Sequence, residues 1–384
     1  MTNTLGLYFH IPYCVHRCSY CDFYSITDRK SGDYEKLLVG IESQINQAYH
    51  ELSHDTGCEY SVGSIFFGGG TPSLMPTEMV EQVLEMGDGK FSFQEGVEIT
   101  LEANPETVTS AWVEGMRKTR VNRISLGAQS FDPRFLKALE RQGSAESICH
   151  AVQRLTDGGF DRLSLDLIFG IPGQTWEDVC SDIENAARLG VSHLSFYQLG
   201  LKPGHVLYTK LPDEDLCSEL YVKGVERLRS LGLHRYEISN FSVEGKESRH
   251  NRLYWEGGDF LGFGPSAASR LFSQGNFRHH KQMSDLSRYY QSLGKPWNWE
   301  ATNRYQTILE ATFLELRTRW GVVSEQFLDR YRYDLRAAKR YLEFSRKGWI
   351  EEKEGRVRLT GEGFLLADYI TRELVDEDRI HAEA

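Results

Sequence analysis

The chain has 384 residues, of which 40% are hydrophobic and 26% are charged, the composition of a soluble globular protein. Its formal net charge of −11 disfavours general binding to nucleic acid or to an anionic membrane. No apolar run reaches the roughly 18–20 residues that a membrane span needs. The N-terminus lacks a basic segment followed by an apolar core, so we expect no signal peptide and a cytoplasmic protein.

In chain order, the first 240 residues alternate short apolar runs with amphipathic stretches. The runs predict strands at 5–11, 64–67, 97–102, 123–126, 162–168, 193–199 and 235–238. The stretches between them predict helices near 33–52, 77–87, 109–119, 144–158, 175–189 and 213–231. Several runs are rich in Ile, Leu and Phe with little alternation, which favours a parallel sheet buried on both faces. Repeated units of about 30 residues predict an α/β protein with a full or partial (β/α) barrel, and a doubly wound sheet is the competing fold.

Three regions follow from this pattern. Residues 1–240 are the predicted barrel core, and residues 241–300 are predicted to be a loop-rich segment. Residues 301–384 are predicted to form a C-terminal domain, with helices at 303–318, 323–331 and 334–347, a hairpin around 348–359 and a closing helix from 361. Helices followed by a hairpin resemble a small winged-helix domain. The slight excess of basic residues there does not indicate a nucleic-acid partner.

The sharpest motif is a group of three cysteines, Cys14, Cys18 and Cys21, directly after the first predicted strand. Barrel enzymes place their chemistry at the carboxyl ends of strands, and three thiolates in one loop can hold one inorganic centre. An iron–sulfur cluster with three protein ligands is the favoured interpretation. The alternatives are a zinc site that borrows His10 or His16, a redox dithiol, or unrelated thiols. Four other cysteines have no ligand spacing and are expected to be reduced and mostly buried: Cys58, Cys149, Cys180 and Cys217.

The stretch from Tyr8 to Phe23 resembles the opening of radical SAM proteins of the oxygen-independent coproporphyrinogen III oxidase group. Further matching segments follow in order at residues 67–73, 101–105, 125–130 and 165–173. The resemblance implies a radical SAM partial barrel and a [4Fe–4S] cluster with one iron open to S-adenosylmethionine (SAM). The residues that it implies as SAM contacts are Tyr8, Tyr20, Gly69, Gly70, Thr71, Glu102, Gln129, Arg141, Asp166 and Ala268.

The resemblance divides between two subfamilies, an oxidase and a haem chaperone. Phe23 stands where the oxidase has a further cysteine, and the N-terminal extension before Cys14 is shorter than in the oxidase. Both departures favour the HemW type of haem chaperone. The alternative is a radical SAM oxidase and decarboxylase of coproporphyrinogen III, so whether the protein is an enzyme stays open. A regulatory or nucleic-acid module is disfavoured by the acidic charge.

A second motif, His250-Asn-Arg252-Leu-Tyr254, is the HNRxY pattern of the chaperone group. Haem takes an axial nitrogen ligand, cationic partners for its propionates and aromatic surface against its ring, and these three residues supply those types. Without the resemblance, His250 reads as a loop histidine bonded to backbone. The resemblance implies haem and an acceptor haemoprotein as partners, with a membrane-associated respiratory protein as one candidate acceptor. We expect no nucleic-acid partner and no integral membrane segment, and a homodimer is an oligomeric state to test.

Overall fold

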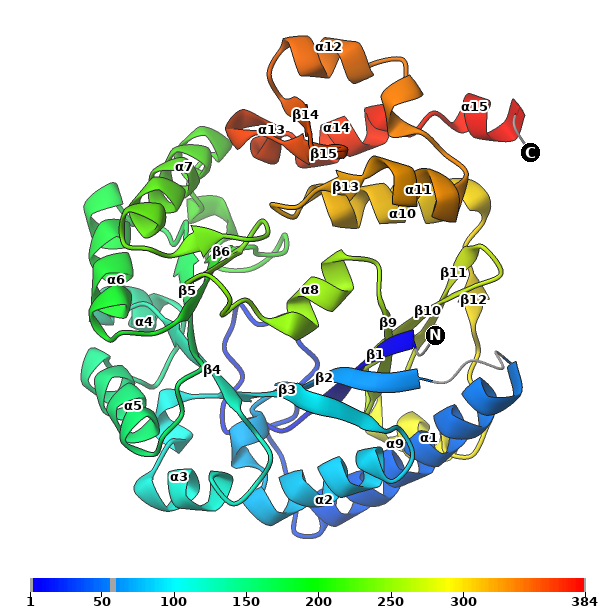
Figure 1. Ribbon diagram of the computed structural model, residues 1–384. Coiled ribbons are helices and arrows are strands. Elements are labelled where there is room, and N and C mark those ends of the chain that lie inside the picture. Colours follow the sequence, from blue (N-terminus) through cyan, green and yellow to red (C-terminus); the bar gives the residue numbers. More distant parts are fainter. Residues whose placement is uncertain (1–2, 56–59, 383–384) are drawn as a thin grey trace.

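The computed structural model describes residues 3–55 and 60–382, and its main body is a curved sheet with helices on its outer face (Figure 1). Strands β1 to β6 lie parallel and side by side in sequence order, as predicted for a partial (β/α) barrel. Along the sheet the strands are β12 (Glu300–Ala301), β11 (Asn276–Lys281), β10 (Ala268–Ser273), β9 (Asp259–Phe263), β1 (Asn3–Ile11), β2 (Tyr60–Gly69), β3 (Phe93–Ala103), β4 (Arg123–Gln129), β5 (Leu163–Phe169), β6 (His193–Gln198), β8 (Asn240–Ser242) and β7 (His234–Arg235).

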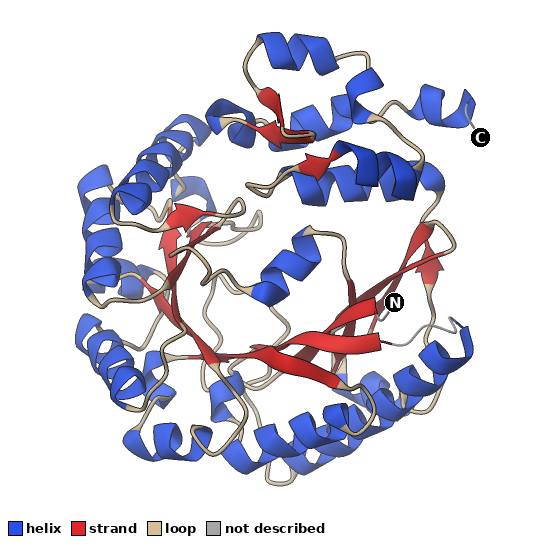
Figure 2. Ribbon diagram, viewed as in Figure 1, coloured by secondary structure: helices blue, strands red, loops and turns tan. Residues whose placement is uncertain are grey.

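The outer wall of the barrel consists of the helices that connect the parallel strands (Figure 2). Helices α3 to α7 each begin at a side-chain cap, such as the capping boxes that begin at Ser144 and Thr175. The helices are α1 (Asp33–Asp55), α2 (Thr77–Asp88), α3 (Ser110–Met116), α4 (Pro133–Ala138), α5 (Ala145–Asp157), α6 (Trp176–Arg188) and α7 (Glu214–Ser230). The sequence reading missed α4. Short 3₁₀ turns lie at Pro72–Leu74, Pro105–Thr107, Tyr208–Lys210 and Leu335–Ala337.

The two faces of the parallel sheet differ in chemistry. On β1, Leu7 and Phe9 are fully buried in the apolar layer beneath the helices. The alternate residue Tyr8 points to the inside of the barrel, next to Phe66 and Glu102. The expected parallel sheet is therefore present, but its inner face is largely polar, and it meets both a cavity and a helix that lies inside the barrel.

The segment 241–300, predicted to be loop-rich, is mostly regular structure, so that prediction is wrong. It contains β8, α8 (Arg249–Trp255), β9, β10, β11, α9 (Leu286–Ser292) and β12. Strand β9 pairs in parallel with β1 and extends the sheet beyond it. Helix α8 lies inside the curve of the sheet (Figure 1). The prediction failed because these strands are short, and because β9 joins the sheet by pairing with β1, which is far away in sequence. Strands β10 and β11 form a local hairpin that the sequence analysis missed.

The C-terminal region closes the side of the barrel between the two sheet edges (Figure 1). Thr318 forms a β-bridge with Glu237 near one edge, and Glu310 bonds to His279 on β11 near the other. The region has its own apolar core and a small sheet in the order β13-β15-β14. Its elements are α10 (Arg304–Leu316), β13 (Val322–Val323), α11 (Ser324–Tyr331), α12 (Tyr341–Arg346), β14 (Ile350–Lys353), β15 (Arg356–Leu359), α13 (Gly361–Leu365), α14 (Ala367–Leu374) and α15 (Glu377–Ala382). Within the described residues, no helix combines the length and apolar character that crossing a membrane requires.

Candidate functional site

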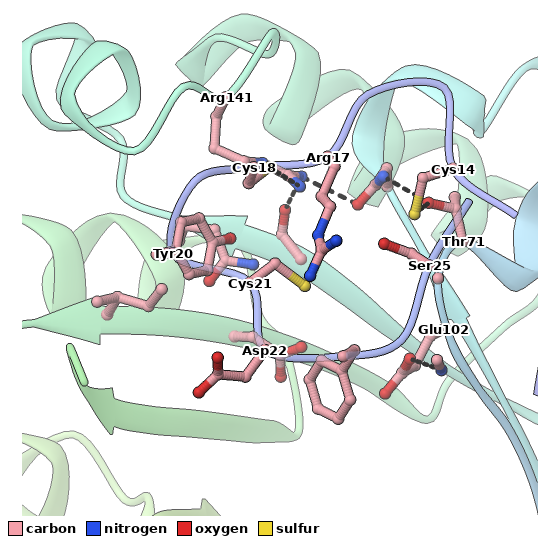
Figure 3. Close-up of a pocket in the computed structure, with 18 of the residues that line it drawn as sticks. Cys14, Arg17, Cys18, Tyr20, Cys21, Asp22, Ser25, Thr71, Glu102 and Arg141 are labelled. Atoms are coloured by element: carbon pink, nitrogen blue, oxygen red, sulfur yellow. Dashed lines mark hydrogen bonds between the residues drawn. The ribbon is translucent and has the colours of Figure 1, made fainter. Parts of the chain in front are cut away.

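A cavity of about 410 Å³ lies at the carboxyl ends of the parallel strands, within the size range of small-molecule sites (Figure 3). One wall is the loop that follows β1. This loop returns on itself, because Ile26 N donates to Pro12 O at 2.7 Å and Cys14 N donates to Ile26 O at 3.0 Å. The loop carries all three motif cysteines, and each of them lines the cavity.

The three thiols are partly exposed to the cavity and are not paired in disulfides. Thr71 Oγ1 lies 3.5 Å from the Cys14 sulfur, and an Arg141 nitrogen lies 3.9 Å from the Cys18 sulfur. Burial, together with the other two thiols, raises the pKa of Cys21. A metal centre or a cation is needed to hold all three as thiolates.

The arrangement fits a cluster better than a single zinc ion. Across the described residues, no three His, Cys, Asp or Glu side chains converge on one metal-ion position. His10 cannot serve as a fourth ligand, since Nδ1 lies 3.1 Å from the Tyr8 hydroxyl and Nε2 lies 2.8 Å from Tyr24 O. His16 lines the cavity and lies 3.9 Å from Glu140, so it does not join the three thiols around one metal-ion position. A cubane cluster presents separate iron atoms to separate sulfurs, so three spread thiols suit it.

The glycine loop after β2 packs tightly against the cysteine loop. A Cβ on Gly70 would lie 2.8 Å from Tyr13 O and 2.9 Å from Ile11 O, closer than real Cβ contacts. Gly69 has φ +111°, a conformation that favours glycine. We expected these glycines to admit a ligand. The structure shows that Gly70 is needed for contact with protein backbone, although both glycines line the cavity.

Two carboxyl groups, Glu102 at the end of β3 and Asp166 on β5, form the floor of the cavity. Burial and the nearby Asp166 raise the pKa of Glu102 to about 8. Burial also raises the pKa of Asp166, while Ser125 Oγ donates to it at 3.4 Å. Glu102 accepts a hydrogen bond of 3.2 Å from Gly69 N–H. Partly unsatisfied carboxyl oxygens in a buried floor suit a ligand with hydroxyl or ammonium donors.

Arg141 supplies a cation on the wall opposite Glu102. Its guanidinium donates to Gly127 O at 2.9 Å and to Asn104 Oδ1 at 3.0 Å, which fixes its direction. The residue lies in the loop between α4 and α5. Gln129, at the end of β4, lines the same wall with φ +69°. A fixed guanidinium suits a carboxylate ligand.

Eight of the ten residues expected to contact SAM line this cavity; Tyr8 and Ala268 do not. The eight are Tyr20, Gly69, Gly70, Thr71, Glu102, Gln129, Arg141 and Asp166. Tyr8 lies next to Glu102, behind the cavity wall, and Ala268 is exposed at the start of β10. The sequence reading missed Arg17, which points into the cavity from the cysteine loop (Figure 3), and Tyr197 at the end of β6. Their positions in the cysteine loop and at a strand end were the available signal.

The residues expected to contact haem lie on α8, away from the cavity walls. His250 is 1% exposed, with Nδ1 2.9 Å from Ser64 Oγ and Nε2 2.8 Å from the Tyr254 hydroxyl. Arg252 pairs with Glu256 at 2.8 Å and lies over the Trp320 ring. The structure does not present His250 as an open ligand. Haem contact by His250, Arg252 and Tyr254 stays a prediction, and it would require these bonds to break.

The remaining cysteines do not form a second site. Cys217 is buried, Cys180 is half-buried and Cys149 is exposed, so the expectation of mostly buried thiols is wrong for Cys149. Cys58 lies outside the described residues.

Comparison with known proteins shows which proteins the chain is related to. The radical SAM superfamily matches residues 8–186. The heme chaperone HemW of Mycobacterium tuberculosis is 30% identical, over 96% of this chain and 94% of that protein. The HemW of Escherichia coli is 33% identical over 70% of each chain, and the HemW of Lactococcus lactis is 29% identical over 97% of each.

Among solved structures, coproporphyrinogen III oxidase (HemN) from Escherichia coli, a radical SAM enzyme, superposes with a TM-score of 0.81. The match covers 97% of this chain and 90% of that one at 21% sequence identity. It shows that the fold is the α/β partial barrel of the radical SAM type with an added C-terminal helical region. The resemblance stated from the cysteine motif is thereby confirmed.

Proposed function

Because the chain belongs to the HemW family of radical SAM proteins, we propose that it is a haem chaperone, which binds haem and passes it to an acceptor haemoprotein. The relatives named HemW match it over nearly its whole length. Besides these relatives, the observation that carries the proposal is the cavity, where three free thiols, a cation and two carboxyls surround one space.

In this proposal Cys14, Cys18 and Cys21 would hold one [4Fe–4S] cluster, and the cavity beside them would take SAM. A bound, reduced cluster would supply the electron for SAM cleavage. The chain's own residues orient the ligand: Arg141 faces a carboxylate, and Glu102 accepts from hydroxyl or ammonium groups.

The second candidate is oxidative decarboxylation of coproporphyrinogen III, and the full-length fold match favours it. Phe23 argues against it, because the resemblance expects a cysteine there in the oxidase. The Phe23 side chain lines the cavity and is 61% exposed, so the position is open to the site and offers no thiol.

The deciding experiment is anaerobic purification followed by two assays on the same sample. Haem binding is followed by the Soret band and by transfer of haem to an apo-haemoprotein. Coproporphyrinogen III is incubated with SAM and a strong reductant. We expect retained, transferable haem and intact substrate. Multiple turnovers to the divinyl product, with no haem retained, would promote the oxidase and reject the chaperone.

A further inference from the structure

His250 is attached to strand β2 at two successive inward-facing positions. Its Nδ1 bonds to Ser64, and its ring stacks on Phe66 with 5.3 Å between centroids and 27° between planes. The second nitrogen bonds to Tyr254 on its own helix. Burial lowers the pKa of His250 to about 3, so the ring is neutral and one nitrogen donates while the other accepts.

From Phe66, close packing continues to the cavity floor. Phe66 stacks on Tyr8, with 6.2 Å between centroids and 24° between planes. A Cβ on Gly68 would lie 2.9 Å from Phe66, 3.0 Å from Tyr8 and 3.2 Å from a carboxyl oxygen of Glu102. The three side chains therefore meet around a residue with no free space. The next residue, Gly69, lines the cavity and donates its N–H to Glu102.

Helix α8 is in turn fixed by strong contacts. Glu98, 1% exposed on β3, accepts from His250 N at 3.2 Å and from Ser248 Oγ at 3.3 Å, and pairs with Arg162 at 2.7 Å. A buried ion pair with this many hydrogen bonds leaves its helix little freedom to shift. We call the contacts from His250 through Phe66 to Glu102 the path. At the start of this path, His250 is therefore held in a fixed position.

Resting on the proposed function, we propose that His250 is a positioning residue for the SAM pocket. It holds Phe66 and β2, and through them it sets the places of the glycine loop and of Glu102. In this role the histidine of the HNRxY motif supports the cofactor cavity from beneath and is not the axial ligand of haem iron. Packed interiors transmit such displacements, because they contain few voids that could absorb them.

The test uses the full-length, anaerobically reconstituted protein with three substitutions: His250→Gln, His250→Leu and Phe66→Leu. SAM affinity is measured by equilibrium dialysis and by the change that SAM causes in the paramagnetic resonance spectrum of the reduced cluster. We expect His250→Leu and Phe66→Leu to raise the SAM dissociation constant on the order of tenfold, as loss of a supporting contact does elsewhere. Iron content should be unchanged. His250→Gln should recover part of the affinity, because its amide can still bond to Ser64.

Phe66→Leu is the decisive variant, since it has no atom that can ligate iron. His279→Gln on β11, outside this path, is the matched control and should bind SAM as the wild type does. The Soret position of the haem complex should be the same in all variants. Unaltered SAM affinity in Phe66→Leu would overturn the proposal, as would a Soret shift in His250→Gln with unaltered SAM affinity.

Failure of the proposed function has a different signature. Wild-type protein that retains SAM but no haem rejects the chaperone, while the SAM comparison still decides the role of His250. Wild-type protein that binds no SAM rejects the role proposed for His250, while retained and transferable haem still supports the chaperone. Thermal melting checks folding, and if His250→Leu does not fold, Phe66→Leu and His250→Gln decide the result.

Discussion

The inside of the barrel has two polar regions, and they differ in whether their polar groups are bonded to other protein groups. Around α8, the nitrogens of His250 are both bonded and Glu98 has an ion pair and two further donors. At the strand ends, three thiols, two carboxyls and Arg17 face open space. Polar groups that are satisfied internally stabilise the fold, whereas polar groups left open toward a shared cavity indicate a ligand. Residue type alone did not separate the two regions.

The largest effect is expected from substitutions at the strand ends, where the polar groups face the cavity. Replacing Cys14, Cys18 and Cys21 together with serine should abolish the broad visible absorbance of the reconstituted protein, because serine hydroxyls replace every thiolate ligand. Iron and sulfide analysis measures the loss. Cys149→Ser, at an exposed cysteine outside the motif, is the control and should leave cluster content unchanged. Four irons per chain in the triple variant would contradict the assignment.

In the region around α8, where the polar groups are bonded internally, a substitution should lower stability and not cofactor content. Glu98→Gln leaves the partly exposed Arg162 without its counter-charge, and breaking a buried ion pair typically costs up to about 3–5 kcal/mol of unfolding free energy. Chemical denaturation measures the change. The matched control is Glu256→Gln, which removes the exposed pair with Arg252 and should cost less than about 1 kcal/mol. Equal effects would mean that Glu98 is not a structural anchor.

A glycine comparison separates packing from ligand access. Gly70→Ala places a methyl against the backbone of the cysteine loop, and overpacking of this kind typically costs about 1–3 kcal/mol. We expect lower melting temperature together with weaker cluster loading and SAM binding. Gly200 also lines the cavity, but an added Cβ there meets nothing within 4 Å. Gly200→Ala should therefore leave melting temperature and cluster loading as in the wild type, and a drop in both would refute the distinction.

The two regions should also respond to pH in opposite directions. The raised pKa of Glu102, about 8, means that the cofactor-free folded protein holds a proton that the unfolded chain releases near pH 4.5. Its contribution to stability is therefore present below about pH 4.5 and is lost as pH rises to 8, at a slope of at most about 1.4 kcal/mol per pH unit. The lowered pKa of His250, about 3, acts oppositely, and stability falls as pH drops below 6.5.

Denaturation of the wild type and of Glu102→Gln across pH 5–8 measures the first effect. As pH rises, the unfolding free energy of the wild type should fall relative to that of Glu102→Gln. A difference independent of pH would show that Glu102 is ionised in the empty cavity. His250→Gln, compared in the same way below pH 6.5, should lose less stability on acidification than the wild type.

Much of the fold followed from sequence pattern, because the parallel strands and their crossover helices are consecutive units of apolar periodicity. The C-terminal helices and hairpin were predictable for the same reason. The strands β9 to β12 were not, since all of them are short and β9 is stabilised by pairing with the distant strand β1, although β10 and β11 form a local hairpin. The three thiols that line the cavity were evident from their spacing, and the carboxyls Glu102 and Asp166 from their positions on the parallel strands.

The sequence by itself determined the barrel and the place of the cysteine site, since local periodicity and a contiguous motif encode both. Only the tertiary structure decided which polar residues remain open to a ligand. His250 lies 186 residues from Ser64 along the chain, and Gly70 packs against backbone that precedes it by a whole helix. Whether a histidine is a free ligand or a bonded support depends on what the fold brings to its two nitrogens, and no local pattern contains that information.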